Sequence, residues 1–326
     1  MERRITAYAA SVFVALLLHG AAGVHAQVFP AEPIRMLVPY PAGGSFDIFA
    51  RVVGQKMASA LGQQIVVDNR GGASGLIAAD LTARAAPDGH TILFGGIGPL
   101  ATLPLLNPKI TYDPLKDFAP LSLVGTAPHI LVVHPALPVK TVQDLIALAK
   151  AKPGQLNYAS GGVAGPPHLA GELLKYMTGT NIVHVPYTGG NQATTGTVSG
   201  QVQLYFSSMA SAVPLVKDGR LRALAVTCSK RSAMIPEVPT VAESGVPGYE
   251  LLTWFMLVAP ARTPQPVVTQ LNREIVNAMS AADVQKRFTD LATDPVSSTS
   301  AEALAFIRSE MAKWTKVIKA AGITAE

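Results

Sequence analysis

Short apolar runs alternate along the chain with segments whose apolar residues recur every three or four positions. The runs are rich in β-branched residues, which is typical of buried strands, whereas the spaced segments are typical of helices. The predicted strands are Ile34–Val38, Ile65–Val67, Thr91–Phe94, Ile130–Val133, Ile182–Val185, Val202–Phe206 and Leu221–Thr227. Their alternation with helical segments predicts an α/β fold with largely parallel sheets.

Two of the predicted helices follow glycine-rich loops that end at Gly44 and Gly165. Helical spacing relates Phe49, Val52, Val53, Met57 and Ala60 after the first loop, and Leu169, Ala170, Leu173, Leu174 and Met177 after the second. Residues 264–322 predict further helices, with breaks near Ser280 and at a turn formed by Asp294 and Pro295. We expect these C-terminal helices to complete the first domain.

The first 26 residues have the pattern of a secretory signal peptide. Arg3 and Arg4 precede an apolar run, Ala7–Leu18, and the small-residue ending Val24-His25-Ala26 comes just before Gln27. The run is short for a membrane span, so a retained anchor is the less favoured interpretation. We expect a mature chain that begins near Gln27 and is exported to the periplasm, with full secretion as the alternative.

Composition restricts the class of protein. Apolar residues make up 49% of the 326 residues and charged residues 14%, which excludes a disordered chain and a charge-rich coiled coil. The net charge of +5 comes from scattered Lys and Arg, so we expect no nucleic-acid partner. Cys228 is the single cysteine, which excludes an internal disulfide, and no zinc-type spacing of Cys and His occurs.

Motifs of the common enzyme classes do not occur in the sequence, which has no GxSxG, Walker A lysine, GxGxxG or HExxH. His129 and His134 lie five positions apart on a predicted strand, so they point to opposite faces and do not predict a shared metal. Ser45 and Ser160 are possible nucleophiles, but each would need a histidine and an acid beside it. We expect no catalytic residue, no metal and no cofactor, and keep an exported α/β hydrolase as the alternative.

The loops at 41–47 and 160–168 have the form of anion-binding sites. A helix N-terminus offers unpaired N–H groups and a partial positive charge, and glycines let a ligand approach that backbone closely. A glycine-rich loop before a helix is also a common plain turn. Two such loops at comparable places in two half-domains favour a clamp for a carboxylate.

A weak internal repeat relates the first loop to a later segment. Residues 38–44, Val-Pro-Tyr-Pro-Ala-Gly-Gly, resemble residues 185–190, Val-Pro-Tyr-Thr-Gly-Gly, and both follow an apolar strand. Coincidence among turn residues explains this similarity as well as two related domains do. In the second interpretation each domain sends a strand-to-helix loop into one cleft, beyond the carboxyl ends of the strands.

Ordered motifs along the whole mature chain resemble those of a known family. They are Val38-Pro39-Tyr40-Pro41-Ala42-Gly43-Gly44-Ser45-Phe46-Asp47 with Ala50-Arg51, then Val67–Arg70, Ala86–Gly89, Leu156–Ser160, His168–Ala170, His184–Tyr187, Leu221–Thr227 and Val238–Glu243. The sequence is thereby similar to the Bug family, the periplasmic solute receptors of tripartite tricarboxylate transporters.

The resemblance implies a two-domain periplasmic binding protein of the Venus-flytrap type that captures a small carboxylate and passes it to membrane permease subunits. The implied domains are residues 27–125 with 253–326, and residues 126–252. In this family, backbone amides and waters of two loops hold the ligand. The candidate ligand-binding residues are Tyr40, Gly43, Gly44, Ser45, Phe46, Asp47, Ser160, Gly161, Gly162, Val163, Ala164, Gly165, His168, Tyr187 and Ser207. We expect a monomer.

Two departures from the family pattern bear on the ligand. Phe46 stands where relatives usually carry a small polar residue, and Ser207-Ser208 stands where an Asp-Asn pair is common. Ordinary drift beside the cleft explains both changes, as does an aromatic mono- or dicarboxylate, such as terephthalate or phthalate, packed against Phe46. An aliphatic di- or tricarboxylate is the alternative. Asp47 either stabilises the first turn of its helix or receives a ligand hydroxyl or ammonium group.

Overall fold

The computed structural model describes residues 29–72, 75–107 and 109–323, and the described residues from 32 to 323 form one compact unit. The predicted signal peptide, residues 1–26, lies outside the described residues. The strands are β1 (Ile34–Val38), β2 (Ile65–Asn69), β3 (Thr91–Gly96), β4 (Phe118–Val133), β5 (Asn157–Ser160), β6 (Val183–Pro186), β7 (Leu204–Ser208), β8 (Arg222–Val226), β9 (Leu252–Pro260) and β10 (Asp294–Pro295).

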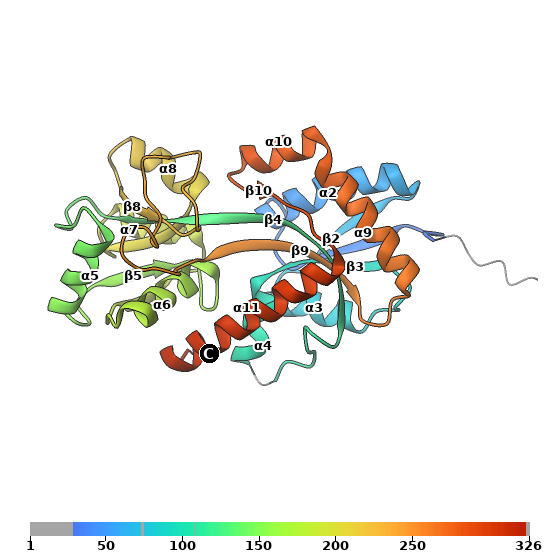
Figure 1. Ribbon diagram of the computed structural model, residues 1–326, viewed down its shortest axis with the longest axis horizontal. Coiled ribbons are helices and arrows are strands. Elements are labelled where there is room, and N and C mark those ends of the chain that lie inside the picture. The colour runs from blue at the N-terminus through green and yellow to red at the C-terminus, as the bar shows by residue number, and fades with distance from the viewer. Residues whose placement is uncertain (1–28, 73–74, 108, 324–326) are drawn as a thin grey trace, which may run out of the picture. The chain divides into compact units, whose positions relative to one another are not determined.

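Helices connect most of these strands (Figure 1). They are α2 (Ser45–Leu61), α3 (Leu76–Ala83), the π-helical turn η2 (Gly98–Thr102), α4 (Leu103–Leu106), α5 (Val142–Ala151), α6 (Pro166–Thr178), α7 (Gly190–Val198), α8 (Met209–Lys217), α9 (Gln265–Ser280), α10 (Ala282–Asp290) and α11 (Ser300–Ala321).

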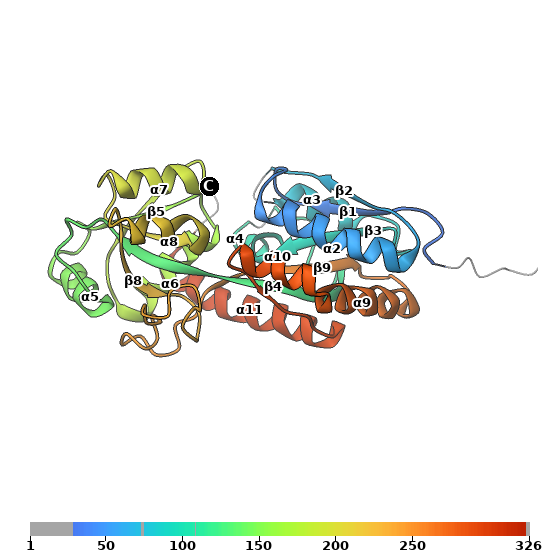
Figure 2. The same ribbon diagram turned by 90° about the horizontal axis from the view of Figure 1, so that it is seen from above.

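Strands pair in two groups that share the long strand β4. In the first sheet, β1 lies parallel between β2 and β3, and β9 continues the order antiparallel to both β3 and β4. In the second sheet, the last residues of β4 pair antiparallel with β7 and β8, and β5 lies parallel between β7 and β6. β4 therefore runs from one sheet into the other, with β9 paired along its first part, as Figures 1 and 2 show.

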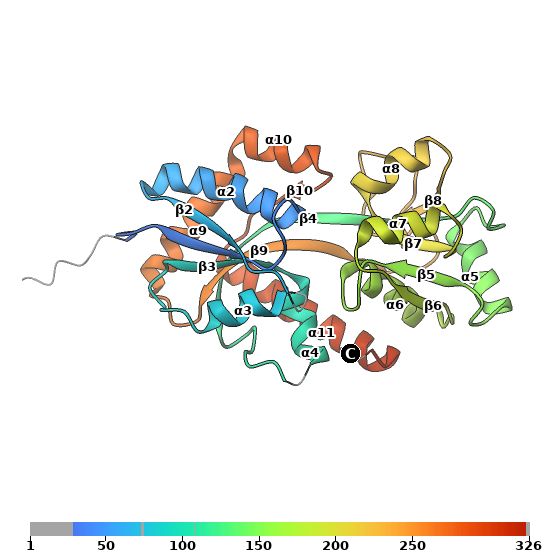
Figure 3. The ribbon, with the colours of Figure 1, turned by 180° about the vertical axis from the view of Figure 1, so that it is seen from behind.

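Helices cover both faces of each sheet. In the first sheet, α2 and α10 lie on one face and α3, α4 and α11 on the other, which is clearest in Figure 3. α9 packs beside α2 and α10. In the second sheet, α5 and α6 pack on one side of β4 and α7 and α8 on the opposite side. Because both faces are covered, strand residues are buried without alternation, and Met36, Leu37 and Val38 of β1 are all fully buried.

The C-terminal helix α11 is anchored to the first sheet by a buried carboxylate. Glu310 Oε2 accepts hydrogen bonds from the indole N–H of Trp254 on β9 and of Trp314 on α11, both at 3.1 Å. Both tryptophans are fully buried. A capping box between Thr299 and Glu302 begins this helix.

The predicted α/β fold is confirmed, and each predicted strand lies within or overlaps an observed one. The prediction of largely parallel sheets is only partly right, because β4 and β9 run antiparallel and make the sheets mixed. The helical C-terminus is also confirmed, with a break after Ser280, but Asp294 and Pro295 pair with β4 as a short strand. The domain boundaries stay a prediction.

Candidate functional site

A cavity of about 710 Å³ lies among loops that come from both sheets. Its wall is formed by Tyr40, Pro41, Ala42, Gly44, Ser45, Phe46, Ile97, Gly98, His129, Gly161, Gly162, Val163, Ala164, Gly165, Pro166, Pro167, Gly190, Asn191, Tyr205 and Thr253. No Asp, Glu, Lys or Arg occurs among these lining residues. An anion in this cavity would therefore be held by neutral donors.

The first loop leads from β1 into α2. Gly43 has a φ of 83°, which an L residue adopts only with strain, and its N–H donates to Asp47 Oδ2 at 2.9 Å. Gly44 is the N-cap of α2, and no side chain satisfies the N–H groups of the first turn. The N–H groups at Ser45 and Phe46 are thus free to bind an anion in the cavity.

Phe46 and Tyr40 line the cavity and belong to an aromatic cluster that continues into the buried core. The ring centroid of Phe46 lies 4.5 Å from Tyr40, 4.6 Å from Phe255 and 6.2 Å from Phe94. Burial raises the pKa of Tyr40 to about 12, so its hydroxyl stays protonated. The contacts with Tyr40, Phe94 and Phe255 fix the Phe46 ring, and the part of the ring that they do not cover lines the cavity.

The second loop leads from β5 into α6. Gly162 has a φ of 139° and Ala164 a φ of 61°, so the loop contains one non-glycine residue in the left-handed region. α6 begins with Pro166 and Pro167, which carry no N–H. The N-terminus of α6 thus offers an anion two N–H donors fewer than that of α2. On this side of the cavity, the backbone N–H groups of the loop before α6 are therefore the main donors that a bound anion could use.

A third loop reaches the cavity from β6 and α7. Gly190 and Asn191 begin α7 and line the wall, at a place that matches the first loop in the internal repeat. A Cβ on Gly161 would lie 2.9 Å from the Gly190 nitrogen, so the second and third loops are in close backbone contact. The two repeated segments therefore face one cavity.

Side chains from the central strands complete the wall. His129 on β4 lies with Nε2 2.9 Å from Thr253 Oγ1 on β9, and Tyr205 comes from β7. Burial lowers the pKa of His129 to about 4, which keeps the ring neutral, and raises the pKa of Tyr205 to about 12. These three residues can offer hydroxyl and imidazole hydrogen bonds, and sequence motifs did not identify them.

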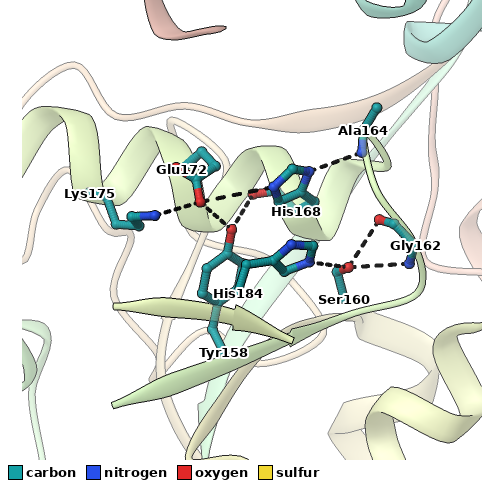
Figure 4. Close-up of polar contacts among 8 residues, drawn as sticks. All are labelled: Tyr158, Ser160, Gly162, Ala164, His168, Glu172, Lys175 and His184. Carbon is teal, nitrogen blue, oxygen red and sulfur yellow. Dashed lines mark hydrogen bonds and ion pairs between the residues drawn. The ribbon is translucent and has the colours of Figure 1, made fainter. Parts of the chain in front are cut away.

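The structure places nine of the predicted ligand-binding residues in the wall: Tyr40, Gly44, Ser45, Phe46, Gly161, Gly162, Val163, Ala164 and Gly165. The other six, Gly43, Asp47, Ser160, His168, Tyr187 and Ser207, lie outside it. Gly43 and Asp47 bond to each other, Tyr187 packs against Gly196, and Ser207 is buried in β7. Ser160 and His168 lie behind the second loop and support it (Figure 4).

Asp47 serves its own loop and helix. Its carboxylate accepts from Gly43 and from Arg51, with the guanidinium 2.9 Å away. Burial opposes ionisation of Asp47, but the hydrogen bonds from Arg51 and Gly43 outweigh it, so its pKa is lowered. This supports the interpretation in which Asp47 stabilises the first turn of α2.

Ser160 is the one candidate nucleophile that lies beside a histidine. Its Oγ is 2.6 Å from His184 Nε2, but it also donates to the Gly162 carbonyl at 3.0 Å. Ser160 is fully buried, and no acid among the described residues hydrogen-bonds to His184. The geometry favours a structural bond over an activated nucleophile.

Other candidate chemistry is sparse in the part of the chain that the structure describes. No group of three or more His, Cys, Asp or Glu side chains there could hold a metal ion. A second cavity, of about 420 Å³, is lined by Cys228 among others, and burial raises the pKa of this thiol to about 11. No helix in the described ranges is long and apolar enough to cross a membrane.

Helices on both faces of two sheets joined by long strands, with a cavity among loops from both sheets, are the architecture of periplasmic solute-binding proteins. The chain belongs to the tripartite tricarboxylate transporter receptor family, whose model matches residues 49–323. It is similar to protein BugT of Bordetella pertussis, with 38% identity over 303 residues that cover 93% of each chain. Members of this family are transport receptors.

Solved structures of relatives share this fold. Rpa4515 of R. palustris, solved with adipate, is 35% identical, with a TM-score of 0.79 over 91% of this chain and 99% of its own. MatC from Rhodopseudomonas palustris, solved with bound malate, is 32% identical, with a TM-score of 0.75 over 89% of this chain and all of its own. The predicted periplasmic-binding-protein fold and the Bug-family resemblance are thereby confirmed.

Proposed function

We propose that this protein captures a small carboxylate in the periplasm and delivers it to the membrane permease of a tripartite tricarboxylate transporter. The observation that carries the proposal is the composition of the cavity wall. The glycine-containing loops at 40–46 and 161–165 both line it, and none of the lining residues is Asp, Glu, Lys or Arg. Backbone N–H groups at a helix N-terminus bind anions without a cationic partner.

The ligand that we favour is an aromatic mono- or dicarboxylate such as terephthalate or phthalate. Tyr40, Phe46 and Tyr205 give the wall an aromatic character, and Ile97 and Val163 add apolar surface. An aromatic ring buried against these residues gains both apolar area and edge contacts. The volume of about 710 Å³ accommodates such a ligand together with bridging waters.

An aliphatic di- or tricarboxylate is the second candidate ligand. The relatives solved with adipate and with malate support it. The close packing of Phe46 on Tyr40 and Phe255 also supports it, because part of the ring surface is already occupied. In either case we propose that residues 27–125 with 253–326 form one domain, that residues 126–252 form the other, and that a monomer closes around its ligand.

Titration calorimetry on the mature chain tests this function with six acids: benzoate, phthalate, terephthalate, adipate, malate and citrate. We expect saturable one-to-one binding of at least one acid, with an aromatic acid preferred. Binding of the aliphatic acids alone would reject the aromatic ligand and keep the receptor. Absence of binding by all six would reject carboxylate capture.

The exported hydrolase makes a different prediction for the same sample. Incubation of the purified chain with ester and amide derivatives of the six acids should give no products above the buffer control. A Ser160→Ala variant serves as the matched control, because it removes the hydroxyl beside His184. Turnover that disappears in this variant would support the hydrolase.

A further inference from the structure

The strained part of the second loop is held by a histidine behind it. Ala164 lines the cavity with a φ of 61°, a conformation that L residues rarely adopt. Its N–H donates to Nδ1 of His168, in the first turn of α6, at 2.9 Å (Figure 4). His168 therefore fixes the backbone of the cavity wall without facing the cavity.

A second histidine fixes the other arm of the same loop. His184 on β6 lies with Nε2 2.6 Å from Ser160 Oγ, which donates to the carbonyl of Gly162 and accepts from its N–H at 3.2 Å. A hydroxyl has one proton, and the Ser160 hydroxyl uses it to donate the hydrogen bond to the Gly162 carbonyl. The proton between His184 and Ser160 then belongs to His184 Nε2.

The two imidazole rings are stacked, with centroids 3.9 Å apart and planes 15° apart. Tyr158 stacks on His184 from β5, with centroids 4.9 Å apart. From α6, Glu172 Oε1 accepts from the hydroxyl of Tyr158 at 2.6 Å and from Lys175 Nζ at 2.7 Å, and it lies 3.9 Å from His168 Nε2. Oε1 of Glu172 is thus already paired, whereas Oε2 is buried without a hydrogen-bond partner among the described residues.

These surroundings keep both rings uncharged. Burial, aided by the charge of Lys175, lowers the pKa of His168 to about 4. Burial lowers the pKa of His184 to about 4 as well, with His168 and Lys175 adding to the shift and Glu172 opposing it. A proton on Nδ1 of His168 would replace the acceptor of the Ala164 N–H by a second donor.

We propose that His168 is a positioning residue for ligand capture, which holds the 160–165 loop in its binding shape as the uncharged Nε2–H tautomer stacked on His184. This inference rests on the proposed function. It gives the histidine a role behind the wall, in place of the ligand contact that the sequence predicted. The acceptor at Nδ1, rather than the ring, is the group that the loop requires.

Two variants of His168 distinguish the role of its Nδ1 as a hydrogen-bond acceptor from the role of its imidazole ring in packing. His168→Asn places an amide oxygen close to the position of Nδ1 and cannot titrate, whereas His168→Leu has no acceptor. Calorimetry at pH 7.0 uses terephthalate and adipate as probes. We expect His168→Asn to bind within about threefold of the wild type and His168→Leu to bind at least about tenfold more weakly, a difference of about 1.4 kcal/mol. Equal affinities in the two variants would overturn the proposal.

His134 provides a matched control away from the cavity. Its Nδ1 accepts the N–H of Ala136 at 3.2 Å, so His134→Leu removes the same kind of bond from another loop. We expect this variant to bind both probes as the wild type does. A tenfold loss in His134→Leu would contradict a role specific to the second loop.

Hydrogen exchange and histidine NMR test the proposal without a ligand. At pH 7.0 we expect the ring of His168 to carry its proton on Nε2. We also expect the Ala164 amide to exchange at least about tenfold more slowly in the wild type and His168→Asn than in His168→Leu. Equal exchange in all three, or a proton on Nδ1, would overturn the proposal. If neither acid binds the wild type, the proposed function is rejected for these probes, and this measurement still decides the role of His168.

Discussion

Replacing Gly161 by alanine should weaken ligand binding more than it weakens folding. The added Cβ would lie 2.9 Å from the nitrogen of Gly190 and 3.1 Å from the carbonyl carbon of Gly189, which are backbone atoms that cannot rotate away. Ordinary contact begins at 3.4 Å, so the second and third loops must separate by about 0.5 Å. Because Gly161 and Gly190 both line the cavity, this shift moves donors away from the carboxylate. We expect affinity to fall at least about tenfold, or about 1.4 kcal/mol.

Calorimetry with the tightest-binding acid of the panel measures this loss, and a urea titration measures the change in stability. Gly179→Ala is the matched control, because Gly179 ends α6 with a φ of 64° and a Cβ there would have no atom within 4 Å. It should lower the free energy of unfolding by about 1 kcal/mol while affinity stays within about twofold. Affinity within twofold of the wild type in Gly161→Ala would refute the role of this loop contact.

Three further predictions concern ligand preference and stability. Phe46→Thr should shift preference from aromatic toward aliphatic acids by about 1 kcal/mol, measured as the ratio of two dissociation constants; an unchanged ratio argues against ring contact. Burial lowers the pKa of His129 and of His168 from 6.5 to about 4, and the charge of Lys175 adds to the shift at His168. As pH falls, these histidines therefore become protonated in the unfolded state before they do so in the folded state. Stability is therefore retained above pH 6.5 and should decrease by about 2 kcal/mol per histidine between pH 7 and pH 5, and a flat urea series over that range would be inconsistent with this. Glu310→Ala leaves two buried indole N–H groups without an acceptor and should lower the free energy of unfolding by about 2–4 kcal/mol. Glu310→Gln keeps an acceptor oxygen and should lose less than half of that. Equal losses in urea titrations of the two variants would argue against a stabilising role of the two indole hydrogen bonds.

Local patterns in the sequence were sufficient for the features that depend on neighbouring residues. The run Ile34–Val38 is buried on both faces, so its continuous apolar pattern identified β1 directly. Gly44 and Gly165 precede their helices in the sequence, so the two loops could be recognised before any tertiary contact was known. Their meeting in one cavity followed from the expectation that ligands bind beyond the ends of strands.

Long-range pairing determines the part of the site that the sequence did not reveal. His129 and Thr253 lie on strands 124 residues apart and meet only because β4 and β9 pair. Tyr205 reaches the wall through the pairing of β7 with β4. His168 lies beside the loop in the sequence, but its side chain points to the rear of it, because it bonds Ala164 and stacks on a residue of β6.

The central claim is that backbone amides of two loops, one from each sheet, hold the carboxylate of the ligand. Amide NMR of the mature chain, recorded with and without a saturating amount of the acid that binds best, tests it most directly. We predict the largest shifts at Ser45 and Phe46 in the first loop and at residues 161–165 in the second. Shifts confined to one of these loops, or centred on the second cavity around Cys228, would contradict the claim.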